Sequence, residues 1–424
     1  MIHRHSLFLA VALAAPLIAQ ETTTKPAPTV AQGPALVLKT SDYTVAAQAA
    51  AMFDRIGDLP QMPDGGHLVL SLGADKALAV TTGSGDVGLA DLVADPAALM
   101  ELYAEELEGV LPMARGALTM GFQQAGLQPK DAARSVANVL DFPKQLQKVV
   151  LKVTGGQSTG GIDSTFAIEG KPGSDFEKFV GLCKPSSQGA PVLATKGAAM
   201  VMSFSLAPDA LAAMFAPMRE LALSMITKDE AQRKEFGALY DQWMALYDGG
   251  ACVSVGEGMR MSMLIGVLDG AKIRQMLSSE AYLAVMRDQK LPDPDMKVEV
   301  SADGFEHRGT KLGKQKLSGG EPNPMMPDGV MESYFGAVGN YMLMAMNGSE
   351  AGAKEIVDAV LDQKVKRAPL AGDAILRLDL DLEALVQQMN AVTGQHGTVE
   401  AMPKSATLSA AAAGKGLQFT LRLK

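Results

Sequence analysis

The chain has 424 residues, a formal net charge of −9, 47% hydrophobic residues and only two cysteines. A chain of this length exceeds what one hydrophobic core usually supports, so two or three domains are expected. The acidic balance, with no cluster of Lys and Arg to override it, argues against nucleic acid and anionic lipid as partners.

Residues 1–19 have the layout of a secretory signal peptide, with Arg4 before an apolar run and small residues near a cleavage point. The apolar run is shorter than the ~20 residues that a membrane-spanning helix needs. Residues 20–40 are rich in Thr, Pro and Ala and are expected to form a flexible tether. Cleavage removes Arg4 and no acid, which takes the charge to −10. The sequence therefore predicts an exported protein, periplasmic or secreted, whose mature part is soluble and has no transmembrane segment.

One sequence phrase occurs three times in the mature chain, beginning at Gly85, Gly197 and Gly372. The first half of each copy alternates or is continuously apolar, as a strand does, and the second half continues with Ala-Leu at helical spacing. In the first copy Asp95 precedes Pro96, a pattern typical of a helix N-cap followed by Pro at the first helical position. Each copy therefore predicts a strand followed by a helix.

Each phrase also leads to a Gly-rich hairpin: "QKVVLKVTGGQSTGGIDSTFAIEG", "GACVSVGEGMRMSMLIGV" and "SATLSAAAAGKGLQFTLRLK". The predicted fold is α+β, built from tandem repeated strand-helix-strand-helices-hairpin units that form mainly antiparallel sheets with helices packed on one face. The predicted boundaries are a first unit over 41–190, a second over 191–317, a Pro- and Gly-rich linker over 318–329 and a C-terminal unit over 330–424.

The segments "GKPGSDFEKF" and "GDAILRLDLDLEAL", together with the Gly-rich hairpins, resemble a loose group of uncharacterised exported bacterial proteins with α+β repeats. The resemblance covers most of the mature chain and carries no specific family motif. It implies an exported α+β repeat protein and transfers no catalytic residue.

Two glycine motifs suggest enzyme chemistry. "GSGDVG" over 83–88 matches a dinucleotide fingerprint, but a strand rather than a helix is expected after it, so no cofactor is predicted. "GQSTG" places Ser158 in the pattern of a nucleophile elbow, but the next segment is also strand-like, and a hairpin turn explains its glycines. A serine hydrolase using Ser158, with His307 or His396 downstream, is kept as an alternative function.

Two methionine triplets, "MRMSM" and "MLMAM", raise the question of a soft metal site. Residues spaced by two on a strand share one face, and three thioethers on one face can hold Cu(I). Core packing is the competing interpretation, because Met fills irregular cores, and a Met-lined groove for an apolar ligand lies between the two. The candidate ligands are Met259, Met261, Met263, Met342, Met344 and Met346.

The two cysteines, Cys183 and Cys252, allow two interpretations. In an oxidising compartment they can form a disulfide, or both can be buried thiols that act as small hydrophobes. Neither has a CxxC neighbour, which argues against redox or zinc chemistry. The leading function predicted from the sequence is an exported, non-enzymatic binding or interaction protein of the cell envelope. Its partner would be an envelope protein or an apolar ligand.

Overall fold

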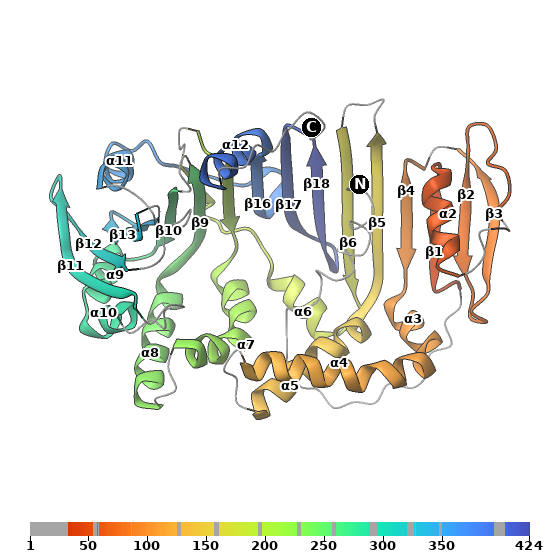
Figure 1. The fold of residues 1–424 in the computed structure, drawn as a ribbon, viewed down its shortest axis with the longest axis horizontal. Helices are drawn as coiled ribbons and strands as arrows, with labels where there is room; N and C mark the ends of the chain where they lie inside the picture. Colours follow the sequence, from red (N-terminus) through yellow and green to blue (C-terminus); the bar gives the residue numbers. More distant parts are fainter. Residues whose placement is uncertain are drawn as a thin grey trace. The chain divides into compact units, whose positions relative to one another are not determined.

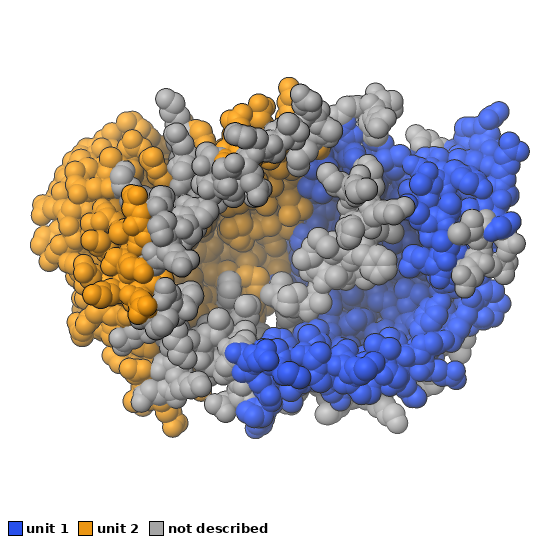
Figure 2. All heavy atoms as spheres, in the orientation of Figure 1, with its two compact units in different colours: residues 1–181, 412–424 blue, residues 182–411 orange. Residues whose placement is uncertain are grey.

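The computed structural model describes residues 33–424 except 54–56, 58, 86, 125–128, 157–160, 194–196, 227–229, 257–259, 288–294, 320–325, 327, 347–349 and 394–402. The predicted signal peptide, Met259, Ser158 and His396 therefore lie outside the described residues. The chain divides into two compact units (Figure 2). Unit 1 comprises residues 1–181 and 412–424, and unit 2 comprises residues 182–411.

Unit 1 is a mixed helix and strand unit. Its described elements are β1 (Leu36–Thr40), α2 (Tyr43–Ala51), β2 (Gly66–Leu72), β3 (Leu78–Ser84), β4 (Ala90–Ala94), α3 (Pro96–Leu102), α4 (Ala104–Gln124), α5 (Pro129–Asp141), the 3-10 turn η3 (Phe142–Gln145), β5 (Leu146–Gly156), β6 (Gly161–Gly170), α6 (Asp175–Leu182) and β18 (Gly416–Leu423). The strands pair antiparallel in the order β18-β6-β5-β4-β1-β2-β3. Helices α4 and α5 lie beyond the strand ends in Figure 1.

The first strand of unit 1 corrects the predicted tether. Leu36–Thr40, placed at the end of a flexible segment by the sequence analysis, form β1 between β2 and β4. The segment LVLKT is a short strand in which Lys39 is the one charged residue and is exposed, while Leu38 is buried with Ala46 and Leu68 in the core cluster of unit 1. Burial of this apolar side chain gives the segment a fixed place in unit 1.

Unit 2 is also a mixed helix and strand unit with antiparallel strands. Its described elements are β7 (Ala190–Val192), β8 (Met200–Ser205), α7 (Pro208–Ile226), α8 (Glu230–Leu246), β9 (Tyr247–Gly256), β10 (Arg260–Val267), α9 (Gly270–Leu277), α10 (Glu280–Arg287), β11 (Lys297–His307), β12 (Thr310–Ser318), β13 (Val330–Val338), β14 (Tyr341–Met346), α11 (Glu350–Leu361), β15 (Lys366–Ala368), η5 (Ala371–Asp373), β16 (Ala374–Asp381), α12 (Leu382–Thr393) and β17 (Ser405–Ala413). The strand order is β11-β12-β13-β14-β10-β9-β8-β16-β17, and β7 pairs separately with β15. The predicted α+β class with a large antiparallel sheet is confirmed.

The two faces of β13 carry different helices. Tyr334 and Phe335 are adjacent on the strand and therefore point to opposite faces. Tyr334 belongs to a core cluster that includes Ile356 and Val357 of α11. Phe335 packs on Tyr282 of α10, with ring centroids 5.6 Å apart. Both faces of this strand thus carry a helix, while packing of helices on one face stays a prediction for the other strands.

The strand-helix pairs predicted from the repeated phrase are present. They are β4 with α3, β8 with α7 and β16 with α12. The opening glycines Gly85, Gly197 and Gly372 have φ of 97°, 67° and 69°, a left-handed conformation that glycine adopts without a Cβ penalty. Asp95 caps α3 as predicted, since its Oδ1 accepts from the backbone N–H groups of Ala97 and Ala98, each at 3.0 Å.

Candidate functional site

The methionine triplets lie side by side on neighbouring strands. In the β10–β14 pair, Met261 is directly opposite Met346 and Met263 is directly opposite Met344. Residues directly opposite in an antiparallel pair point to the same face. The four side chains therefore share one face of the unit 2 sheet, and we call them the methionine quartet (Met261, Met263, Met344 and Met346).

The same face continues as an apolar surface over the next strands. Val255 and Val253 of β9 lie opposite Met261 and Met263, and also opposite Met200 and Met202 of β8. Leu380 and Leu378 of β16 lie opposite Met200 and Met202 in turn. We call this surface the methionine face. It consists of the quartet together with Met200, Met202, Val253, Val255, Leu378 and Leu380.

The methionine face is more open than the opposite face of the same strands. Its six methionines are each half-buried. On the opposite face, Cys252, Leu264 and Leu343 are fully buried in the core cluster that contains α11. Of the two remaining predicted methionines, Met259 is outside the described residues, and Met342 lies opposite Ile265 and is buried. On the strand "MLMAM", Leu343 and Ala345 therefore form a fully buried face, while Met344 and Met346 on the other face keep partial access to solvent.

The charged side chains on the polar face of β16 form hydrogen bonds with each other and with β17. Arg377 forms two hydrogen bonds to Asp379, of 2.7 and 2.9 Å, and the hydroxyl of Thr407 donates to Asp379 at 2.9 Å. Partial burial tends to raise the pKa of Asp379, but the hydrogen bonds from Arg377 and Thr407 outweigh it and lower the pKa. This face therefore presents a stable ion pair rather than a reactive carboxylate.

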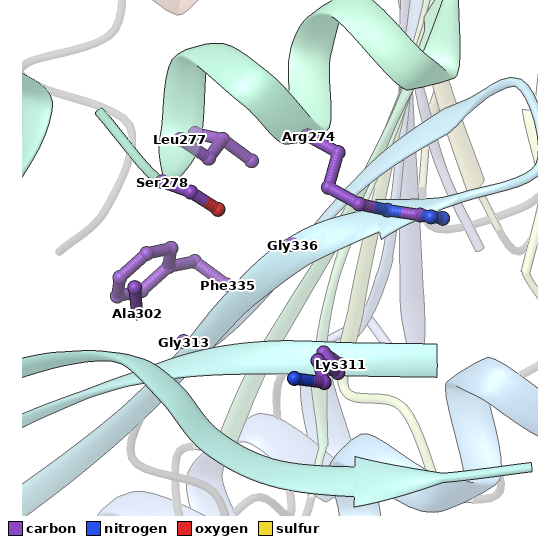
Figure 3. Close-up of a pocket in the computed structure, with 8 residues that line it drawn as sticks. All are labelled: Arg274, Leu277, Ser278, Ala302, Lys311, Gly313, Phe335 and Gly336. Atoms are coloured by element: carbon purple, nitrogen blue, oxygen red, sulfur yellow. The ribbon is translucent and has the colours of Figure 1, made fainter. Parts of the chain in front are cut away.

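A small hollow lies between α9 and strands β11, β12 and β13 (Figure 3). Arg274 and Lys311 project from its two sides. Arg274 Nη2 donates to the carbonyl of Ala337 at 3.3 Å, and Lys311 Nζ lies 3.6 Å from Asp303 Oδ1. Both cations thus have partners within the protein. The lining residues are Arg274, Leu277, Ser278, Ala302, Lys311, Gly313, Phe335 and Gly336.

A buried ion pair joins two distant segments of unit 2. Arg367 of β15 binds Asp248 of β9 in bidentate geometry, at 2.6 and 2.8 Å, and the Asp248 side chain is only 4% exposed. The backbone N–H of Gly250 donates to Asp248 Oδ1 at 3.0 Å. A Cβ at Gly250 or Gly266 would overlap with Arg367, so these glycines leave the space for the guanidinium. Sequence reasoning missed this pair because its members are 119 residues apart and follow no motif.

The predicted serine site is flanked by strands. Ser158 itself is outside the described residues, but β5 precedes it and β6 follows it, paired antiparallel up to Gly156 and Gly161. A nucleophile elbow requires a helix after the serine. His307 Nε2 lies 2.9 Å from Asp358 Oδ1, within a surface cluster that includes Arg308. The hydrolase interpretation stays a prediction, and the flanking geometry is that of a hairpin.

The segment that matches the dinucleotide fingerprint also continues into a strand. Gly83 is part of β3, and the next element is β4. Over the described part of this segment, no strand-to-helix turn follows the glycines, as a pyrophosphate site needs.

Cys183 and Cys252 are both free thiols. Cys183 is 1% exposed and Cys252 is fully buried. Burial raises the pKa of the Cys183 thiol to about 12, and burial also raises that of Cys252. In these buried positions the thiolate forms are suppressed, and the disulfide between Cys183 and Cys252 stays a prediction.

Among the described residues, no three His, Cys, Asp or Glu side chains come together as a possible metal site. No helix in the described ranges is both long and apolar enough to cross a membrane. No protein-family model, curated protein or solved structure matches the chain.

Proposed function

We propose that the chain is an exported binding protein of the cell envelope and that it binds an apolar ligand through the methionine face of unit 2. The observation that carries this proposal is the register of β8, β9, β10 and β14, which gathers six half-buried methionines on one face. Export is supported by the signal-peptide pattern of residues 1–19.

Methionine suits such a surface because its side chain is unbranched, flexible and polarisable. It adapts to ligands of different shape, and its thioether forms favourable contacts with aromatic rings. The neighbouring Val253, Val255, Leu378 and Leu380 add branched, rigid apolar groups. The methionines and leucines of this face keep partial access to solvent, while Val253 and Val255 between them are buried. Partly exposed apolar side chains gathered on one face are a feature of interaction sites.

We also propose that the chain derives from a repeated strand-helix-strand-helices-hairpin unit, with copies over 41–190, 191–317 and 330–424. Support comes from the three strand-helix pairs that each follow a left-handed glycine. Each unit buries its apolar surface against its neighbours in such arrays.

The binding proposal is tested with a hydrophobic dye such as ANS and the mature chain beginning at Gln20. We expect the folded protein to bind dye, and we expect the double variant Met263→Gln/Met344→Gln to lose most of that binding, because Gln has a similar length but a polar end. Fluorescence titration gives the measurement. The matched control is Met113→Gln/Met120→Gln on α4, where both side chains are exposed (70% and 58%), and dye binding should remain unchanged there. Failure of the folded wild-type chain to bind dye would remove the proposal.

A further inference from the structure

The methionine quartet has the spacing of a single binding site. Cross-strand neighbours in an antiparallel pair have Cβ atoms about 4.5–5.5 Å apart. Residues spaced by two on a strand are about 7 Å apart, from a rise of about 3.4 Å per residue. Four long, flexible side chains at the corners of such a rectangle can bring their sulfurs over its centre, because each has three rotatable bonds.

This arrangement is more compact than either triplet on one strand. The ends of a triplet such as Met342 to Met346 are about 14 Å apart along the strand, from the same rise per residue. In the structure Met342 is also buried and lies opposite Ile265, away from the quartet's centre. Strand pairing therefore replaces the two triplets with one set of four thioethers drawn from both.

The surroundings of the quartet favour a soft, singly charged ion. The positions opposite it on the flanking strands are held by Val253, Val255, Ser333 and Phe335, none of which is charged. Thioether sulfur is a soft ligand that selects Cu(I), whereas Ca²⁺, Mg²⁺ and Mn²⁺ require several oxygen ligands, and the Ser333 hydroxyl is the one side-chain oxygen at these opposing positions. All four methionines are half-buried, which combines access for an ion with an apolar environment.

We propose that the methionine quartet binds one Cu(I) ion through three or four thioether sulfurs. The step is ligand binding alone: the copper enters and stays as Cu(I), and no electron or proton is transferred. The inference rests on the proposed function in one respect, because both require that the methionine face be accessible in the folded chain. It goes further by naming the ligand set and the class of ligand.

The test uses the mature full-length chain and Cu(I) kept reduced under anaerobic conditions, in competition with the chromophoric chelator bicinchoninate. We expect one Cu(I) per chain. In a quadruple variant with Leu at all four positions, the affinity should fall by roughly 100-fold or more, since even outer-shell changes at metal sites cost 10–100-fold. The pair Met113→Leu/Met120→Leu on α4 is the control and should leave the affinity unchanged.

The Met-to-Leu variants distinguish copper binding by the quartet from binding of an apolar ligand by the methionine face. Met-to-Leu changes nearly conserve volume and hydrophobicity, so the quadruple variant should fold and should still bind the hydrophobic dye. Loss of copper with retained dye binding supports the copper site. Equal copper affinity in the wild-type and quadruple variant, or no copper binding by wild-type protein that binds dye, overturns the copper site and leaves the apolar surface standing. If the quadruple variant does not fold, the doubles Met261→Leu/Met346→Leu and Met263→Leu/Met344→Leu give the same comparison.

Discussion

At the scale of single residues, Asp248 and Arg367 form a buried ion pair within unit 2. A bidentate carboxylate–guanidinium pair recovers its desolvation cost only with good geometry and further hydrogen bonds. Here the Gly250 N–H supplies one such bond, and the guanidinium lies over the Tyr341 ring at 5.6 Å from its centroid. The pair also ties β15, and through it β7, to the main sheet of unit 2.

We expect Arg367→Met to destabilise unit 2 by about 3 kcal/mol, because removing one partner leaves a buried charge uncompensated. Trp243 is the only tryptophan of the chain, and its ring centroid lies 6.2 Å from that of Tyr247, next to Asp248. Trp fluorescence during urea unfolding therefore reports on the unfolding of unit 2. Adding Asp248→Asn should recover part of the loss, since it removes the stranded charge. A single variant as stable as the wild type would show that the pair contributes nothing.

At the scale of elements, local sequence signals predicted more than did long-range ones. The N-cap at Asp95, the strand after Gly85 and the hairpin strands around Ser158 follow from periodicity, capping and glycine placement, and the structure has them. The methionine quartet could not be predicted, because alternation shows which residues share a face of one strand but not which strand lies beside it. β14 pairs with β10 across about 80 residues of intervening chain, so the merging of the two triplets is a consequence of tertiary pairing.

The capping of α3 yields a prediction at this scale. We expect Asp95→Ala to destabilise α3 by about 1 kcal/mol, since the first-turn N–H groups of Ala97 and Ala98 lose their acceptor. Hydrogen exchange read by mass spectrometry should show α3 amides exchanging about fivefold faster, the factor that corresponds to this free energy. Asp95→Ser keeps a capping oxygen and should exchange nearly as the wild type does. Unchanged exchange in the alanine variant would mean that packing, not the cap, sets the stability of α3.

At the scale of the whole molecule, unit 1 takes one of its strands from the C-terminal part of the chain. β18 (Gly416–Leu423) pairs with β6 over its full length, and Phe419 lies opposite Phe166 with ring centroids 6.1 Å apart. The partners are separated by some 250 residues, which include the whole of unit 2. Such non-local pairing is entropically costly to form and slows folding. Strand β18 can therefore pair with β6 only after unit 2 has been synthesised.

Deleting residues 416–424 should weaken unit 1 and spare unit 2. Without β18, the backbone groups of β6 that face it lose their partners, and β6 becomes an open edge. We expect β6 amides to exchange at least tenfold faster, which corresponds to a local loss of about 1.4 kcal/mol, while the urea midpoint of Trp243 in unit 2 stays close to that of the full chain. Leu421→Thr is the matched control, because this side chain is 36% exposed and its replacement keeps the strand backbone and introduces a β-branched residue, a type that strands favour. Equal exchange of β6 in the truncated and full-length chains would show that unit 1 is stable without its C-terminal strand, and a parallel drop in the Trp243 midpoint would show that the two units do not unfold independently.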